Sequence, residues 1–239
     1  QENTLTGCEG LKTTITVTVS GTPSAPTVSD VSYCKDDVST ALTATASSGN
    51  TLVWYDANQS ELTSGAPTPS TASVGTTTYY VAQQTASGCE GSKSTITVTV
   101  NALPVAPSST SSIEYCKDAT ATALTATASG GHTLVWYGTD GTTVLSGAPT
   151  PSTVSVGSTT YYVAQQNTTT GCEGLKTTIT VTVNALPVAP TATTTVDYCQ
   201  DATATALTAT ASSGHTLVWY GTDGTTVLSG APVPPTSTA

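Results

Sequence analysis

The chain repeats itself with a period of about 82 residues, and this period limits the fold more than any other feature of the sequence. Three kinds of marker share the spacing: a Cys that follows Tyr, a Trp that follows Leu-Val, and a Cys within Gly-Cys-Glu-Gly. In chain order these markers are Cys34, Cys116 and Cys199; Trp54, Trp136 and Trp219; and Cys8, Cys89 and Cys172. A period of this length predicts a tandem array of small domains that contact only their neighbours.

The phase of the repeat predicts the domain boundaries. Residues 24–105 and 106–188 are complete repeats, residues 1–23 correspond to the last part of a repeat, and residues 189–239 correspond to the first part of another. We expect the chain to be a segment of a longer array, because a boundary in mid-strand leaves unpaired sheet edges. The connectors 102–107 and 185–190 each hold two Pro residues, which favour extended backbone and predict short, stiff links.

Composition and pattern predict an all-β fold. Charged residues make up 8% of the chain, against about 25% in a typical globular domain, and Thr, Ser, Ala and Val dominate without helical periodicity. Alternation of apolar and polar residues within a repeat predicts about seven short strands packed as a β-sandwich. The strands expected in the second complete repeat cover residues 123–128, 133–137, 142–145, 154–156, 159–164 and 177–183, with an Asp140-Gly141 hairpin turn and with Ile179, Val181 and Val183 facing inward.

The formal net charge of −10 argues against a nucleic-acid partner. Phosphate binding needs a basic face, and the five Lys residues are too few and too scattered to form one. No apolar run approaches the roughly 20 residues that span a bilayer. The five Lys residues are Lys12, Lys35, Lys93, Lys117 and Lys176.

Two segments of each repeat resemble the core of immunoglobulin domains. Trp136 resembles the core Trp, and residues 160–163 resemble the Tyr-Tyr-Cys strand with Val163 in place of the Cys. The resemblance implies that Leu–Trp–Val packing replaces the buried disulfide of that fold, and that Tyr79 and Tyr161 are candidates for a tyrosine corner. The core residues predicted in this way are Leu42, Trp54 and Val81; Leu124, Trp136 and Val163; and Leu207 and Trp219.

The order of motifs along the chain gives a closer resemblance. Tyr-Cys, Ala-Leu-Thr-Ala-Thr-Ala, Leu-Val-Trp-Tyr, Thr-Thr-Tyr-Tyr-Val-Ala, Gly-Cys-Glu-Gly and Ile-Thr-Val-Thr-Val follow one another as in the Ig-like repeats of Bacteroidota surface proteins. Those proteins are exported by type IX secretion and include gliding-motility adhesins. The resemblance implies an extracellular, outer-membrane-associated location, with neighbouring repeats and the secretion or motility machinery as partners. Surface polysaccharide would be bound only by domains outside this segment.

The six cysteines predict disulfides and an oxidising compartment. Two pairings are open. The cysteines pair within each repeat, as Cys34–Cys89 and Cys116–Cys172, or across the junction between consecutive repeats, here called the joint, as Cys34–Cys172. In the immunoglobulin order Cys34 precedes its core Leu by eight residues, whereas Cys89 follows its core Val by eight. At about 3.3 Å per residue this places them at opposite ends of the sandwich, although loops can curl back. In the second scheme the remaining cysteines, Cys8, Cys89, Cys116 and Cys199, pair outside the segment.

The sequence gives no grouping of residues typical of a catalytic or metal site. His132 and His215 occupy one equivalent loop position, where the first complete repeat has Asn50, so we interpret them as turn residues and expect no enzyme activity. Without a Cys-x-x-Cys pair, zinc is not expected, and we expect no cofactor. Calcium at the joints is the alternative, since acidic residues fall near the predicted domain ends: Asp36, Asp37, Asp118 and Asp201.

Two functions fit these observations. The first is a structural stalk of a large surface adhesin, such as a gliding-motility filament, in which near-identical units raise a distal head. The second is an accessory module, for carbohydrate or protein, within a secreted multidomain enzyme. The outward tyrosines Tyr55, Tyr137 and Tyr220 would suit the second if they formed a row for sugar stacking, but we expect them to pack on the outer face of a neighbouring strand.

Overall fold

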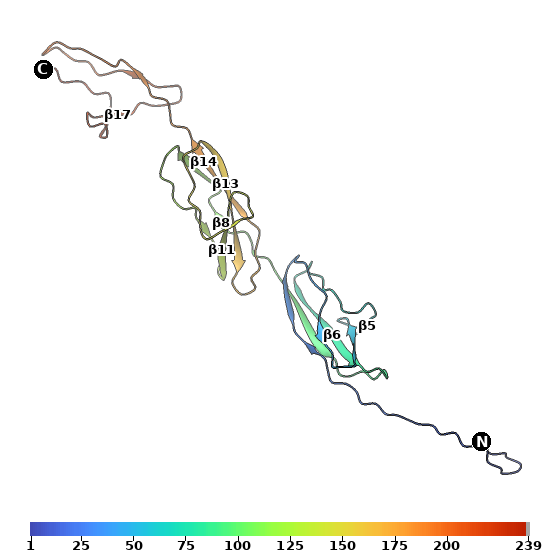
Figure 1. Cartoon of the computed structure of the whole chain (residues 1–239). Coiled ribbons are helices and arrows are strands. Elements are labelled where there is room, and N and C mark those ends of the chain that lie inside the picture. Colours follow the sequence, from blue (N-terminus) through green and yellow to red (C-terminus); the bar gives the residue numbers. More distant parts are fainter. Residues whose placement is uncertain (238–239) are drawn as a thin grey trace.

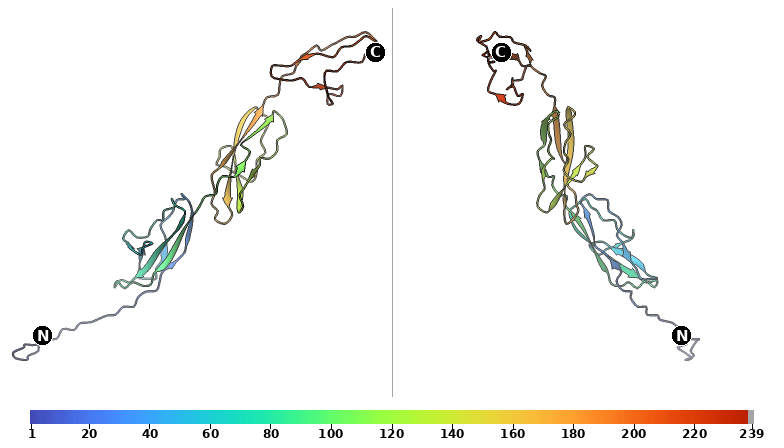
Figure 2. Two further views of the ribbon diagram at one scale, coloured as in Figure 1. Left: turned by 180° about the vertical axis from the view of Figure 1, so that it is seen from behind. Right: turned by 60° about the vertical axis from the view of Figure 1, so that its left-hand side comes forward.

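The computed structural model describes residues 1–237 and shows an elongated chain of separate β-sandwich units (Figures 1 and 2). Strands β1 to β7 lie between Thr27 and Asn101 and form the first complete unit, here called repeat 1. Strands β8 to β14 lie between Ser108 and Asn184 and form repeat 2. The fold class is therefore all-β, with tandem sandwiches arranged along a line. Within the described residues, no helix is long and apolar enough to cross a membrane.

Repeat 1 consists of a five-stranded sheet facing a two-stranded ribbon. The large sheet has the order β2-β7-β6-β4-β5, and β1 pairs with β3 in the ribbon. All neighbours are antiparallel except β2 and β7, which run parallel. The strands are β1 (Thr27–Val28), β2 (Val31–Cys34), β3 (Ala44–Thr45), β4 (Thr51–Tyr55), β5 (Glu61–Leu62), β6 (Gly75–Gln84) and β7 (Ser94–Asn101).

Repeat 2 has the same topology. Its large sheet has the order β9-β14-β13-β11-β12, with β9 and β14 parallel, and β8 pairs with β10. The predicted hairpin at Asp140-Gly141 is confirmed, since the amide of Gly141 donates to Gly138 and the amide of Gly138 to Thr143. The strands are β8 (Ser108–Ser109), β9 (Ser112–Cys116), β10 (Ala126–Thr127), β11 (His132–Tyr137), β12 (Val144–Leu145), β13 (Gly157–Asn167) and β14 (Thr177–Asn184).

The two end segments show what an incomplete repeat can form. Residues 1–10 make a small hairpin closed by a bridge between Glu2 and Glu9, and the following residues 11–19 are exposed. Residues 189–237 form two ribbons only, β15 (Thr191–Ala192) with β16 (Ala209–Thr210) and β17 (Trp219–Tyr220) with β18 (Val227–Leu228).

Each complete repeat has one apolar core between its sheets. Leu42, Trp54 and Val81 lie in the core of repeat 1 together with Ile96 and Val98. The equivalent cluster of repeat 2 is Leu124, Trp136, Val163, Ile179 and Val181. In residues 189–237, Leu207 and Trp219 are only partly buried, because the counterparts of β13 and β14 that would cover them are not part of this segment.

Three of the predicted strands are shorter in the structure or absent from it. Residues 154–156 are not a strand, residues 142–145 form one only at Val144–Leu145, and residues 123–128 form one only at Ala126–Thr127. For residues 123–128 the reason is local: the amide of Leu124 donates to the carbonyl of Pro149 at 2.9 Å, but Pro has no N–H to return a ladder bond. Close to residues 154–156, the Thr153 hydroxyl donates to the carbonyl of Ala119 at 2.6 Å.

A tyrosine other than the two tyrosine-corner candidates holds a loop through its hydroxyl, and the loop is a different one. The rings of Tyr79 and Tyr161 pack against the two cores. The hydroxyl that accepts from a loop amide belongs to the Tyr that precedes the Cys of each repeat. Tyr115 accepts from the amide of Thr122 at 3.3 Å, and its counterparts Tyr33 and Tyr198 do the same for Thr40 and Thr205.

Candidate functional site: the joint between repeats

A disulfide joins the two complete repeats to each other. It links Cys34, the last residue of β2 in repeat 1, to Cys172, in the loop between β13 and β14 of repeat 2. The Cα–Cα distance is 5.5 Å, within the usual range for a disulfide. Of the two pairings left open by the sequence, the structure therefore has the one across the joint. Cys8, Cys89, Cys116 and Cys199 are unpaired in the structure.

The positions of the cysteines explain why pairing within a repeat is not observed. Cys34 lies beside Asn101, where β7 leaves repeat 1. Cys89 lies at the other end of the same repeat, where its Sγ atom is 3.8 Å from the carbonyl of Ser20 in the segment that enters the repeat. One cysteine thus marks the exit of a repeat and the other marks the entry, and only cysteines of consecutive repeats can meet.

The joint buries the bridge. Cys172 is fully buried and Cys34 is half-buried, whereas the equivalent Cys116 is exposed. The loop that carries Cys172, residues 167–174, is closed locally: the amide of Gly171 donates to Asn167, and the amide of Asn167 donates to Cys172. Residues 1–10 form the same kind of hairpin without a surrounding domain, so the short sequence around Gly-Cys-Glu-Gly is sufficient for this conformation.

A buried glutamine fastens the connector to the repeat that follows it. Gln165 on β13 is 0% exposed. Its Nε2 donates to the carbonyl of Val105 in the connector at 2.7 Å, and its Oε1 accepts from the amide of Ser129 at 2.7 Å. Gln83 does the same in repeat 1, with the carbonyl of Ser24 and the amide of Ser47.

The glycine that ends the Gly-Cys-Glu-Gly motif lets the hairpin and the connector approach closely. A Cβ added at Gly174 would collide with the backbone carbonyl of Pro104, and one added at Gly91 would collide with that of Pro23. The clash involves backbone, which cannot move aside as a flexible side chain could. The connector is therefore stiff because it is docked against the next repeat, in addition to the restriction imposed by its prolines.

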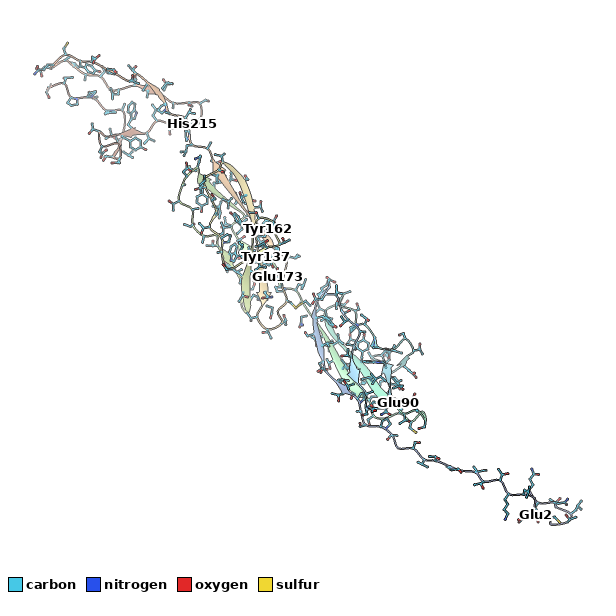
Figure 3. The ribbon with its side chains drawn as sticks, in the orientation of Figure 1. Glu2, Glu90, Tyr137, Tyr162, Glu173 and His215 are labelled. Atoms are coloured by element: carbon cyan, nitrogen blue, oxygen red, sulfur yellow. A yellow bond between two sulfur atoms is a disulfide. The ribbon has the colours of Figure 1, made fainter. Side chains whose placement is uncertain are left out.

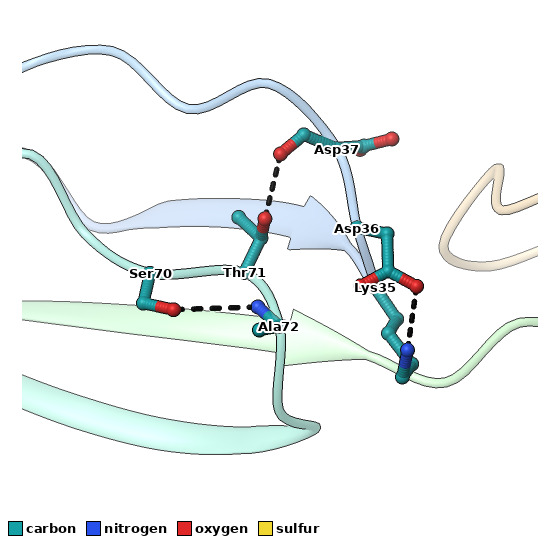
Figure 4. A network of polar contacts seen from close by, with 6 residues as sticks. All are labelled: Lys35, Asp36, Asp37, Ser70, Thr71 and Ala72. Carbon is teal, nitrogen blue, oxygen red and sulfur yellow. Dashed lines mark hydrogen bonds and ion pairs between the residues drawn. The ribbon is translucent and has the colours of Figure 1, made fainter.

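An acidic turn continues the chain directly after Cys34 (Figure 4). Lys35 pairs with Asp36 at 2.5 Å, and the amide of Cys34 donates to the Asp37 carboxylate at 2.8 Å. The Thr71 hydroxyl donates to the carbonyl of Asp37 at 2.6 Å. Asp36 has a φ of 66°, a left-handed conformation that Asp tolerates better than most residues. These acidic side chains thus shape the turn that presents Cys34.

The outward tyrosines of the two complete repeats are covered and do not form a sugar-stacking row. Tyr137 is 5% exposed, with the Lys176 ammonium 3.6 Å from the centre of its ring. Its hydroxyl donates to Glu173, the residue after Cys172, and the two side chains lie together in Figure 3. Burial and the hydrogen bond to a carboxylate raise the pKa of Tyr137 to about 12. The pair therefore anchors the hairpin that carries the bridge.

Repeat 1 has the same arrangement on its outer face. Tyr55 is 7% exposed, donates to Glu90 at 2.6 Å, and has the Lys93 ammonium 3.3 Å from its ring centre. Burial, followed by the hydrogen bond to Glu90, raises the pKa of Tyr55 strongly. Tyr220, in the incomplete unit, is half exposed.

The other candidates from the sequence lie in turns. The ring of His132 contacts the carbonyl of Gly130 through Nδ1, and His215 contacts Ser213 in the same way, while Asn50 bonds to Gln83. Among the described residues, no group of three or more His, Cys, Asp or Glu side chains is placed to hold a metal ion.

Sequence reasoning missed the glutamines and the Tyr–Glu pairs that hold the joint. Val-Ala-Gln-Gln recurs in both complete repeats, and strand alternation places Gln83 on the same face as the core residue Val81. A polar residue at an inward position of a repeated strand is the signal that could have identified these residues.

The chain belongs to the family described as "Ig-like domain CHU_C associated", which matches residues 23–102 and 104–185 in two tandem copies. The family is one of Ig-like domains associated with cell-surface proteins of Bacteroidota. No curated protein sequence matches the chain.

Several solved structures are similar in fold. The fibronectin(III)-like modules of CbhA from Clostridium thermocellum are 15% identical, with 66% of this chain and 91% of that chain covered and a TM-score of 0.37. An I-band fragment of titin is 14% identical, with 69% and 64% covered and a TM-score of 0.29. The glucan-utilisation protein SGBP-B of Bacteroides ovatus is 17% identical, with 64% and 42% covered and a TM-score of 0.23.

Replacing Gln165 by Leu will destabilise repeat 2. The substitution keeps the side-chain size but removes two hydrogen bonds, the one that Gln165 donates to the carbonyl of Val105 and the one that it accepts from the amide of Ser129, each worth about 0.5–1.5 kcal/mol. We expect a loss of about 1–3 kcal/mol in the free energy of unfolding, measured by urea titration. Gln166→Ala, on the next and more exposed position, is the control: it removes only an exposed hydrogen bond to the carbonyl of Gly171 and should change the free energy of unfolding by no more than about 0.5 kcal/mol. Equal effects of the two would contradict the role of Gln165.

The Tyr137–Glu173 pair predicts a loss of stability in alkali. The hydroxyl ionises near pH 10 in the unfolded chain but only near pH 12 in the folded repeat. Its contribution is present in full below about pH 10 and is lost as the pH rises to about 12. In urea titrations, the stability difference between the unsubstituted chain and Tyr137→Phe should be constant below pH 10 and shrink above it. Tyr162→Phe serves as control, and a difference independent of pH would refute the assignment.

Proposed function

We propose that the chain is a stalk segment of an extracellular surface adhesin, in which tandem repeats hold a binding head away from the cell envelope. The observation that carries this proposal is the joint. Three features restrict motion between consecutive repeats: the disulfide, the close packing of the connector against the repeat that follows it, and the hydrogen bond from the buried Gln165 to the connector. None of these features would improve a ligand site within a single repeat, whereas all of them keep a chain of repeats straight.

The surfaces of the two complete repeats support the same proposal. They carry the same Tyr–Glu–Lys group at equivalent positions, and in both the ring is covered by Lys. A binding module needs exposed rings or a group of side chains that differs from the scaffold. The repeats offer neither at these positions, which favours the stalk over an accessory module of a secreted enzyme. We propose accordingly that the segment has no catalytic activity of its own.

We further propose that the parent protein is a type IX-secreted, outer-membrane-associated adhesin, of which the gliding-motility adhesin SprB is an example. Membership of a family associated with Bacteroidota surface proteins supports this proposal. Its partners would be the neighbouring repeats and the secretion or motility machinery, with polysaccharide bound elsewhere in the molecule.

The stalk function predicts that length scales with the number of repeats. When residues 24–188 are duplicated within the chain, the maximum dimension from small-angle X-ray scattering should grow in proportion to the added repeats, because each joint is stiff. A compact particle that grows much less would contradict a stalk.

Binding measurements on the same proteins distinguish the accessory module. The chain should show no saturable binding on an array of bacterial and plant glycans. Saturable binding that is lost when Tyr55 and Tyr137 are replaced would support the accessory module instead.

A further inference from the structure

The bridge closes a covalent loop that contains most of both repeats. Cys34 and Cys172 are 138 residues apart in sequence. Strands β3 to β7 of repeat 1 and β8 to β13 of repeat 2 lie inside the loop, together with Trp54 and Trp136 of the two cores. Only β1 and β2 of repeat 1 and β14 of repeat 2 lie outside it.

The loop leaves a short direct path along the backbone from one end of the pair to the other. The path enters repeat 1 near residue 24, follows β1 and β2 to Cys34, crosses the bridge to Cys172, and leaves along β14 to Asn184. Cys34 lies at the exit end of repeat 1, beside Asn101. The loop carrying Cys172 lies at the entry end of repeat 2, where Gly174 touches the connector. The direct path therefore runs through both repeats from end to end.

The direct path has little length in reserve. Most of it is β-strand, which rises about 3.3 Å per residue, and a chain pulled straight reaches at most about 3.6 Å per residue. Its strands are also held by their neighbours: β2 pairs with β7 at four positions, and β14 lies between β13 and β9. Tension applied to the two ends thus meets a path that is already nearly straight.

We infer that the pair of repeats is a tension-bearing unit in which the Cys34–Cys172 bridge carries load past both hydrophobic cores. This inference rests on the proposed stalk function and states how the stalk would resist tension. While the bridge is intact, pulling cannot extend residues 35–171, even if either core opens. When the bridge is reduced, the same pull can release up to about 500 Å of chain, from 138 residues at about 3.6 Å each.

Single-molecule pulling tests the inference. The whole chain is attached to DNA handles through peptide tags at its two ends, so that no cysteine is used for attachment. The reference variant carries Cys8→Ser, Cys89→Ser, Cys116→Ser and Cys199→Ser, which leaves only the bridge. A second variant adds Cys34→Ser and Cys172→Ser, and reductant applied to tethered reference molecules provides the same comparison without a further substitution.

The oxidised reference should stretch without any step that corresponds to a whole repeat. After reduction, or in the variant without the bridge, two steps of roughly 80 residues each should appear, and the total extension should rise by about 450–500 Å. Whole-repeat steps of equal size in oxidised and reduced molecules would overturn the inference that the bridge carries the load past the two cores. That result would leave the stalk proposal standing, because stiffness and glycan binding are measured separately.

Discussion

The disulfide between Cys34 and Cys172 is the contact on which the arrangement of the repeats depends. Each sandwich has its own core and needs no bridge to bury it, which separates this fold from immunoglobulin domains with a disulfide between their sheets. In the chain-entropy treatment, a crosslink across a loop of more than 100 residues is worth about 5 kcal/mol. Here the crosslink joins two folded repeats and restricts how they move relative to each other. The parallel pairing of β2 with β7 places Cys34 at the exit of its repeat, and the anchored hairpin presents Cys172 at the entry of the next.

Much of the fold could be predicted from sequence because equivalent positions in the copies of the repeat can be compared with one another. Alternation in residues 177–183 and the Asp140-Gly141 turn identified elements that the structure contains, since both patterns are local. The strand prediction for residues 123–128 was wrong over most of its length, because Leu124 lies opposite Pro149. Whether a strand forms at Leu124 is decided by the missing N–H of a residue that is distant in sequence.

The site was less accessible to sequence reasoning than the fold. The strand order of immunoglobulin domains places Cys34 and Cys89 at opposite ends of a repeat, which favours a bridge across the joint. The paths of the loops could not be derived from sequence, so both pairings stayed open. The roles of Gln165 and Gly174 depend on how closely the connector approaches the domain. That distance arises only when the complete sandwich and the connector are assembled, so no spacing in the sequence encodes it directly.

The pairing of the cysteines is the most direct test of a covalent bridge between consecutive repeats. Trypsin cleaves after the five Lys residues and places every cysteine in a separate peptide, so a digest without reduction followed by mass spectrometry assigns the pairing. A bridge between Cys34 and Cys172 joins peptide 13–35 to peptide 118–176. Peptide 13–35 joined to 36–93, with 94–117 joined to 118–176, would instead show bridges within the repeats and would rule out the bridge between them.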